Sequence, residues 1–234
     1  RLVLEEAVES FEKKEKTIVR TSKGTEIETD MVVLSIGVKP ETDLAKKAGI
    51  ELGETGGILT GPDMRTTDPH IYAVGDAVEV EDVVSGGKTL LPLAGPANKQ
   101  GRIAADNALG KKDEFAGVQG TSVVKVFDLT AACTGNNEKN LQNRGIHYRA
   151  SYTHSFSHAS YYPGAQRMAV KLLFSPESGK VLGAQVIGRK GVDKRVDVFA
   201  TAVRAGMTVY DLEEIDLGYA PPYGSAKDPV NIAG

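Results

Sequence analysis

The chain has 234 residues, of which 41% are hydrophobic and 25% charged, and its formal net charge is −3. This is the composition of a soluble globular protein, and the near-neutral charge gives no electrostatic argument for binding nucleic acid or a membrane surface. No apolar run approaches the roughly 20 residues that span a bilayer, and a single cysteine excludes an intrachain disulfide framework. A cytoplasmic location is therefore expected.

The first 49 residues are predicted to form strands and one short helix. Residues 17–20 and 25–28 flank a Lys23-Gly24 turn, which indicates a hairpin. The continuous apolar run at residues 31–36 predicts a strand that is covered on both faces of a sheet. Residues 42–48 are predicted to form a helix that ends at Gly49.

A short apolar strand is predicted at residues 71–74, directly before Gly75 and Asp76. Glycine allows the backbone to approach a ligand closely, and a carboxylate at the carboxyl end of a buried strand suits the hydroxyl groups of a nucleotide or sugar. Taken alone, a Gly-Asp pair is also common in ordinary turns. Residues 79–88 are predicted to form a polar loop.

A helix is predicted from Pro96, as its first residue, to about Leu109. Its amino terminus would present free N–H groups and the positive end of the helix dipole. Such an end stabilises a bound anion. A plain capped surface helix is the alternative.

After a polar linker at residues 111–114 the pattern changes to an α+β layer, with antiparallel strands and helices on one side. Alternating apolar positions in residues 167–174 indicate a strand with one buried face. Strands are predicted at residues 122–127, 149–153, 167–174 and 180–187, and helices at residues 137–144 and 193–205.

Two loops rich in tyrosine, proline and glycine could carry chemistry, at residues 158–164 and 219–229. Proline and glycine fix such loops in defined conformations. A tyrosine hydroxyl can donate a hydrogen bond or a proton to a sulfur leaving group. Packing at an interface, where tyrosine is common, is the alternative.

The combined string at residues 56–58, 64–67 and 69–76 resembles the second flavin-binding signature of the FAD-dependent pyridine nucleotide–disulfide oxidoreductases. The resemblance implies that Asp76, beside Gly75, binds the ribityl chain and neighbouring phosphate of FAD. It implies that the later helix points at the isoalloxazine ring. It also places Gly37 near the nicotinamide nucleotide. The residues expected to bind FAD at the start of this helix are Leu93, Ala94, Gly95 and Ala97.

The resemblance covers nearly the whole chain and maps to the carboxyl-terminal half of such enzymes. No Gly-x-Gly-x-x-Gly follows a strand, so both dinucleotide fingerprints and the redox cysteine are expected upstream of Arg1. The implied fold is α/β and α+β: the end of a doubly wound NAD(P)-binding domain at residues 1–37, the returning part of an FAD-binding domain at 38–112, and an antiparallel-sheet dimerisation domain at 113–234.

The tyrosine loops narrow the resemblance to the branch that uses one redox cysteine. The His-x-x-x-x-Glu pair of the glutathione-reductase-like branch is absent, whereas residues 158–165, His-Ala-Ser-Tyr-Tyr-Pro-Gly-Ala, look most like coenzyme A–disulfide reductases. This implies a homodimer with reciprocal active sites, in which Tyr161 and Tyr219 reach the partner's cysteine and its CoA adduct. Tyr223 is expected to pack on flavin or at the interface.

By that resemblance, electrons pass from NAD(P)H through FAD to a mixed disulfide of CoA with the cysteine, and the resulting thiolate attacks the next CoA disulfide or related persulfide. The tyrosines would then stabilise or protonate the leaving sulfur. The alternatives are an NADH oxidase or peroxidase of the same family, and a module that only mediates dimerisation.

Other reactive side chains are predicted to have structural roles. Cys133 is expected to be a buried small residue in a strand-to-helix turn. The four histidines lack metal-ligand spacing, so no metal is expected. A solvated helix start is expected for the basic residues, which are Arg189, Lys190, Lys194 and Arg195.

Overall fold

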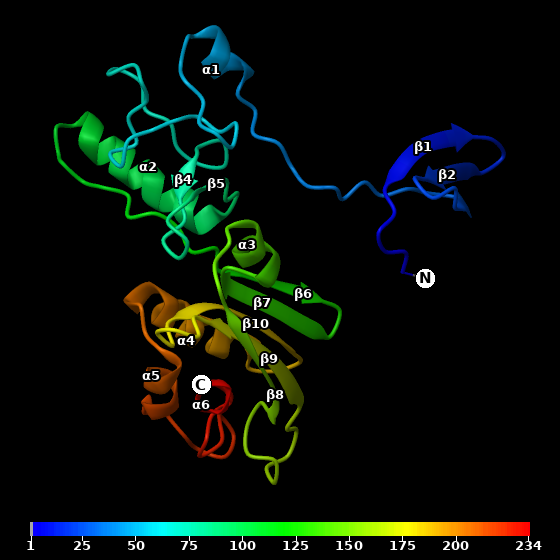
Figure 1. Ribbon diagram of the computed structural model, residues 1–234, viewed down its shortest axis with the longest axis vertical. Coiled ribbons are helices and arrows are strands. Elements are labelled where there is room, and N and C mark those ends of the chain that lie inside the picture. The colour runs from blue at the N-terminus through cyan, green and yellow to red at the C-terminus, as the bar shows by residue number, and fades with distance from the viewer. Residues whose placement is uncertain (1) are drawn as a thin grey trace. The chain divides into compact units, whose positions relative to one another are not determined.

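The computed structural model describes residues 2–234 and divides the chain into two compact units, residues 1–39 and residues 40–234 (Figure 1). In the described part of the chain, no helix combines the length and apolar character needed to cross a membrane.

The first unit is a three-stranded antiparallel sheet of β1 (Val8–Lys13), β2 (Thr17–Thr21) and β3 (Glu26–Thr29), in that order. The predicted hairpin is confirmed, since β2 pairs with β3 across a turn in which Gly24 adopts a positive φ of 79°. Phe11 on β1 pairs with Val19, which is buried.

The predicted strand at residues 31–36 is wrong. No strand is assigned there, and Met31, Val33 and Ile36 expose 75%, 75% and 90% of their surface. A strand of a parallel sheet needs hydrogen-bonding neighbours on both sides, and none of the described residues pairs with this run.

The second unit begins with α1 (Asp43–Lys47), the short hairpin of β4 (Val80–Glu81) and β5 (Lys88–Thr89), and α2 (Ala94–Ala108). Residues 71–74 do not form the predicted regular strand, because only Tyr72 makes a β-bridge, to Arg65. The predicted polar loop at 79–88 is instead the β4–β5 hairpin. It buries Glu79, whose carboxylate accepts hydrogen bonds from the backbone and hydroxyl of Thr55.

The rest of the unit is a five-stranded antiparallel sheet in the order β6-β7-β10-β9-β8. The strands are β6 (Ser122–Val126), β7 (Leu129–Gly135), β8 (Arg149–Phe156), β9 (Arg167–Phe174) and β10 (Val181–Gly188). The predicted antiparallel layer is confirmed, and β7 is a strand that the sequence reading did not identify.

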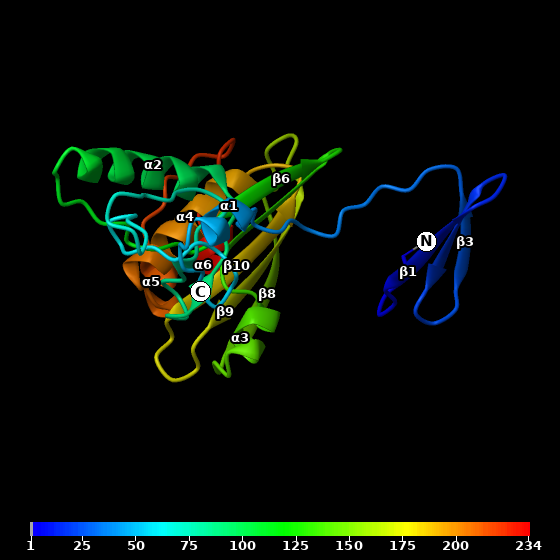
Figure 2. The same ribbon diagram turned by 90° about the horizontal axis from the view of Figure 1, so that it is seen from above.

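Three helices cover one face of this sheet (Figures 1 and 2). They are α4 (Val192–Ala205), α5 (Val209–Glu214) and α6 (Pro229–Ala233). Alternate residues of β9, Met168, Val170 and Leu172, point into a core around Phe199. The expectation of helices on one side only is wrong, because α3 (Glu138–Asn143) packs on the other face through Leu141 and Leu173.

Polar contacts join the sheet to the α2 region. Asp82, buried after β4, accepts a hydrogen bond of 2.8 Å from Asn136 Nδ2, at the end of β7. Arg144 donates to the Lys88 carbonyl at 2.9 Å. Buried polar groups need such partners, so Asp82 and Asn136 fix these two parts of the unit against each other.

Phe199→Ala is expected to lower the free energy of unfolding by about 3–5 kcal/mol, because it removes a ring with 0% exposed surface and leaves a cavity. Phe127→Ala makes the same chemical change at a site that is 93% exposed and should change the free energy by less than about 0.5 kcal/mol. Urea unfolding followed by circular dichroism measures both, and equal losses would contradict this core.

Candidate functional site

The first candidate site lies where Gly75 meets α2. The Gly75 N–H donates a 2.7 Å hydrogen bond to Oε1 of Gln100, a residue of α2 with only 2% exposed surface. Gly75 has a φ of +88°, a conformation that favours glycine, and a Cβ there would lie 3.9 Å from the Cβ of Ala97. The buried amide of Gln100 therefore holds the Gly75 turn against the first turn of the helix.

Asp76 follows this turn and is exposed. Its carboxylate makes no hydrogen bond or ion pair with any residue between 2 and 234. Its carboxylate oxygens are therefore free to accept hydrogen bonds from ligand hydroxyls.

The amino terminus of α2 is open. The helix begins at Ala94 and not at Pro96, so Pro96 is its third residue, a position in the first turn where a missing N–H costs no intrahelical bond. Leu93 caps the helix without a side-chain hydrogen bond, and the first turn contains no acidic residue. No described group accepts from the N–H of Ala94 or Gly95, and a Cβ on Gly95 would meet open space.

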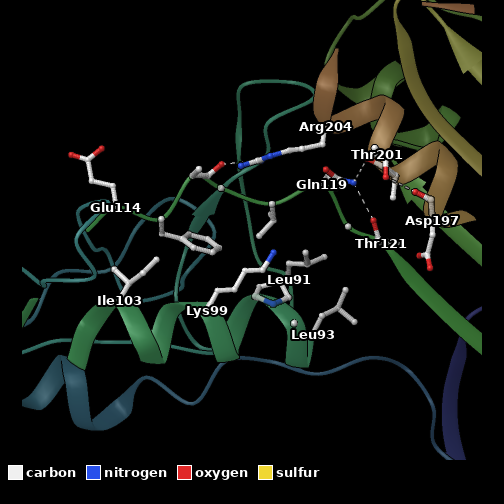
Figure 3. A pocket seen from close by; sticks show the side chains of 18 of the residues that line it. Leu91, Leu93, Lys99, Ile103, Glu114, Gln119, Thr121, Asp197, Thr201 and Arg204 are labelled. Carbon is white, nitrogen blue, oxygen red and sulfur yellow. Dashed lines mark hydrogen bonds between the residues drawn. The ribbon is translucent and has the colours of Figure 1, made fainter. Parts of the chain in front are cut away.

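A cavity of about 780 Å³ opens beside this helix end, between α2, residues 114–121 and α4 (Figure 3). Leu91, Leu93 and Ile103 give it an apolar wall. Its lining also contains three cations, which are Lys99, Arg102 and Arg204, and Figure 3 shows Lys99 extending from α2 into the cavity. Gln119 closes another side by donating to the Ala200 carbonyl at 2.8 Å. The volume lies within the roughly 300–1,000 Å³ range of ligand sites.

The second candidate site is a pair of tyrosines on two loops. The hydroxyl oxygens of Tyr161, between β8 and β9, and Tyr219, between α5 and α6, lie 2.9 Å apart and share a hydrogen bond. The two side chains are 74% and 48% exposed. The structure thus brings together two residues that are 58 positions apart in the sequence, and it presents both hydroxyls to the outside.

The hydrogen bond between the two hydroxyls raises the pKa of the Tyr161 phenol, with smaller contributions from desolvation and from the charge that Tyr219 would carry when ionised. A raised pKa means that the neutral phenol is favoured over the phenolate. Tyr161 therefore stays protonated, and able to donate a hydrogen bond, throughout the neutral pH range.

The two loops also contact each other through their backbones. Ala159 N–H donates to the Gly224 carbonyl at 2.8 Å. His158 is buried, accepts or donates through Nδ1 to Ser157 Oγ at 3.1 Å, and places its ring edge-on to Tyr162 at 6.0 Å. No described group hydrogen-bonds to its Nε2.

Two further residues were predicted as site residues. Tyr223 is 72% exposed, in the same loop as Tyr219. Gly37, with a φ of +97°, belongs to the first unit. In Figure 1 the β8–β9 connection lies at the opposite end of the second unit from α2, so one chain does not bring Tyr161 to its own Gly75 turn.

Two predictions for single residues are wrong. Cys133 lies within β7, half-buried, with its Sγ 3.3 Å from Ser122 Oγ, and not in a turn, because the strand continues to Gly135. Arg195 is not solvated: its exposed surface is 1%, since it lies on the apolar stripe of α4. Within residues 2–234, no group of His, Cys, Asp and Glu side chains is arranged to hold a metal.

Three residues that shape these sites were missed. Gln100 positions Gly75, and Arg195 and Asp228 form a buried ion pair of 2.8 Å beneath the tyrosine loops. A signal for Arg195 was present, because it is spaced three and four residues from Val192 and Phe199 on the buried face. Asp228-Pro229 is a helix-start signal.

Comparison with known proteins gives two family models that match most of the chain. Residues 1–101 match "Pyridine nucleotide-disulphide oxidoreductase", and residues 121–228 match its "dimerisation domain". Both agree with the resemblance drawn from the flavin signature and the tyrosine loops.

Named relatives agree as well. The chain is 36% identical over 226 residues to a Pyrococcus furiosus "NAD(P)H sulfur oxidoreductase (CoA-dependent)", covering 97% of this chain and 50% of the relative. It is 32% identical to a Staphylococcus epidermidis "Coenzyme A disulfide reductase", covering 88% and 47%. The crystal structure of reduced Bacillus anthracis CoADR-RHD superposes with a TM-score of 0.92 at 51% identity, covering 98% of this chain and 41% of that one. The chain spans about half the length of the curated relatives it matches.

Tyr219→Phe is expected to lower the Tyr161 pKa toward the ordinary tyrosine value, because the hydrogen bond that favours the neutral phenol is lost. The sign follows from the raised pKa: the bond stabilises the fold below the ordinary pKa and is lost as pH rises through the folded pKa. Spectrophotometric titration of tyrosinate measures the change. Tyr210→Phe, at a 70% exposed tyrosine of α5, is the control and should leave the Tyr161 pKa unchanged.

Proposed function

The chain belongs to the pyridine nucleotide-disulphide oxidoreductase family, and on that basis we propose that it is the carboxyl-terminal part of a flavoprotein reductase. The proposed reaction passes electrons from NAD(P)H through FAD to CoA disulfide or a related persulfide, by way of a single redox cysteine outside this chain. The observation that carries the proposal is the exposed hydroxyl pair of Tyr161 and Tyr219, 2.9 Å apart.

The residues around the Gly75 turn fit an FAD molecule. Asp76 has a free carboxylate for ribityl hydroxyls, and the exposed backbone at Gly95 leaves room for a ring system at the end of α2. An uncapped helix terminus without acidic residues suits the negative charge of a reduced flavin. Bound there, FAD would accept a hydride from NAD(P)H and deliver an electron pair to a disulfide.

The tyrosine pair suits the cleavage of a disulfide. When a thiolate attacks one sulfur of a disulfide, a new S–S bond forms, the old one breaks, and the other sulfur leaves as a thiolate. Tyr161, kept neutral by Tyr219, can donate its proton or a hydrogen bond to that leaving sulfur. Because the shared hydrogen bond raises the Tyr161 pKa, it favours hydrogen-bond donation by the neutral phenol over complete transfer of its proton.

A homodimer explains why the two candidate sites lie at opposite ends of the second unit. Residues 121–228 match a dimerisation domain, and the tyrosine pair is exposed in one chain. We therefore propose reciprocal active sites, in which the Tyr161–Tyr219 pair of one subunit serves the flavin and cysteine of the other.

The protein that contains this chain is expected to oxidise NAD(P)H in the presence of CoA disulfide without oxygen. Tyr161→Phe and Tyr219→Phe should each reduce kcat by about 10²-fold, the lower end of the contribution of general acid catalysis. Tyr210→Phe is the matched control and should keep full activity, since its ring lies on α5. Anaerobic absorbance measurements of NAD(P)H consumption and free thiol release test this.

The same assay separates the related reactions. NAD(P)H consumption only when oxygen or peroxide is admitted would contradict the disulfide reductase assignment and favour an oxidase or peroxidase. Dimers without any flavin absorbance would contradict both enzyme assignments and leave a dimerisation role.

Asp76→Asn is expected to weaken FAD binding by about tenfold, because charge-assisted hydrogen bonds to the ribityl hydroxyls are replaced by weaker neutral ones. Asp43→Asn, at another exposed carboxylate in the same part of the chain, is the control. The ratio of flavin to protein after purification and fluorescence titration of the apoprotein with FAD measure both. Equal FAD affinity in the two variants would argue against the placement of FAD at Asp76.

A further inference from the structure

The side chain of Arg195 lies inside the protein beneath the tyrosine loops. It is on α4, its exposed surface is 1%, and its neighbours on the helix, Val196 and Phe199, belong to the apolar core. A guanidinium stays charged at every physiological pH. Its burial is therefore unfavourable unless every part of it is paired.

The guanidinium is paired on three sides. Nη2 donates to Asp228 Oδ2 at 2.8 Å and to the Ser157 carbonyl at 2.9 Å, and Nε donates to Asp228 Oδ1 at 3.2 Å. Nη1 donates to the Gly191 carbonyl at 3.3 Å. The two-point contact with Asp228 is the geometry that a planar guanidinium makes with a carboxylate and that a lysine cannot reproduce.

These partners are the bases of the two tyrosine loops. Ser157 is the first residue after β8 and begins the loop that carries Tyr161. Asp228 ends the loop that carries Tyr219 and caps α6, accepting from Val230 N–H at 3.1 Å. One side chain therefore holds one end of each loop.

The remaining ends are fixed nearby. The first loop is closed by a 2.8 Å hydrogen bond that the Ser157 N–H donates to the Gln166 carbonyl. Asn231 holds the other end of the second loop by donating to the carbonyls of Leu212 at 3.0 Å and Ile215 at 2.9 Å. Between these ends, the Ala159–Gly224 backbone bond joins the two loops and the tyrosine rings are exposed. The separation of the rings therefore depends on this bond and on how the loop bases are held.

We propose that Arg195 and Asp228 are positioning residues that hold the two loops in register, so that the hydroxyls of Tyr161 and Tyr219 meet as one pair. Neither residue touches the hydroxyls, and both act through the loop bases. A buried ion pair often contributes little net stability compared with apolar side chains of the same volume. Its effect here is on geometry, and the catalytic consequence rests on the proposed function of the tyrosine pair.

The test uses Arg195→Lys in the protein that contains this chain. A single ammonium keeps the charge but cannot bond both oxygens of Asp228 and the Ser157 carbonyl together. The Tyr161 pKa, obtained from the difference in tyrosinate titration between each protein and its Tyr161→Phe form, is expected to fall toward the ordinary value. With CoA disulfide, kcat should fall about tenfold or more, as for a small misplacement of catalytic groups, with KM for NAD(P)H and flavin content unchanged.

Asp228→Asn is the second variant, because asparagine still caps α6 but loses the charge that pairs with Arg195. Val196→Ala is the matched control: it removes buried volume from the next position of α4 and destabilises the core. It leaves the tyrosine loops and their hydrogen bonds in place. If a loss of stability alone lowered the Tyr161 pKa, it would therefore lower that pKa in Val196→Ala as well.

A lowered Tyr161 pKa in Arg195→Lys and Asp228→Asn, but not in Val196→Ala, supports the positioning role. An unchanged Tyr161 pKa in either folded variant overturns it. If Arg195→Lys does not fold, Asp228→Asn decides by the same measurement. Because the titration needs no turnover, it decides the positioning role even if CoA disulfide proves not to be a substrate, a result that would overturn the proposed function alone.

Discussion

The ion pair between Arg195 and Asp228 is the interaction on which the tyrosine site depends. It connects a helix of the core with the strand end at Ser157 and with the cap of α6. A protein interior tolerates such a charge only where acceptors are already placed around it. The acceptors that make the burial of the guanidinium tolerable are therefore supplied by the bases of the two loops that it connects.

The two candidate sites of the second unit differ in their chemistry. The Gly75 turn and α2 offer an open backbone and a free carboxylate, which suit an anionic ligand with many hydroxyls. The loops around Tyr161 and Tyr219 present phenol hydroxyls that can donate hydrogen bonds. The hydrogen bond between Asp82 and Asn136 joins the β4–β5 hairpin to the end of β7 within the second unit. In the proposed reciprocal arrangement, the geometry of the dimer would set how the donors of one copy meet the ligand of the other.

Local patterns in the sequence predicted most of the antiparallel layer, because its strands alternate and its helices carry caps, as at Gly206. They also marked the two loops that carry the tyrosine pair, and the resemblance to the family then selected Tyr161 and Tyr219 within those loops. They failed where the outcome depends on distant partners. Arg195 looked solvated because its neighbours in sequence are charged, whereas its acceptor at Asp228 is 33 residues away. The contact of Gln100 with Gly75 likewise has no local signature.

The apolar run at residues 31–36 has a consequence for how the polypeptide behaves. Six residues rich in β-branched and aliphatic side chains, exposed and unpaired, have the composition of a cross-β aggregation segment. Asp30 and Lys39 flank the run as charged gatekeepers. Self-association of chains through this exposed segment therefore competes with folding, and a higher protein concentration favours the aggregated form.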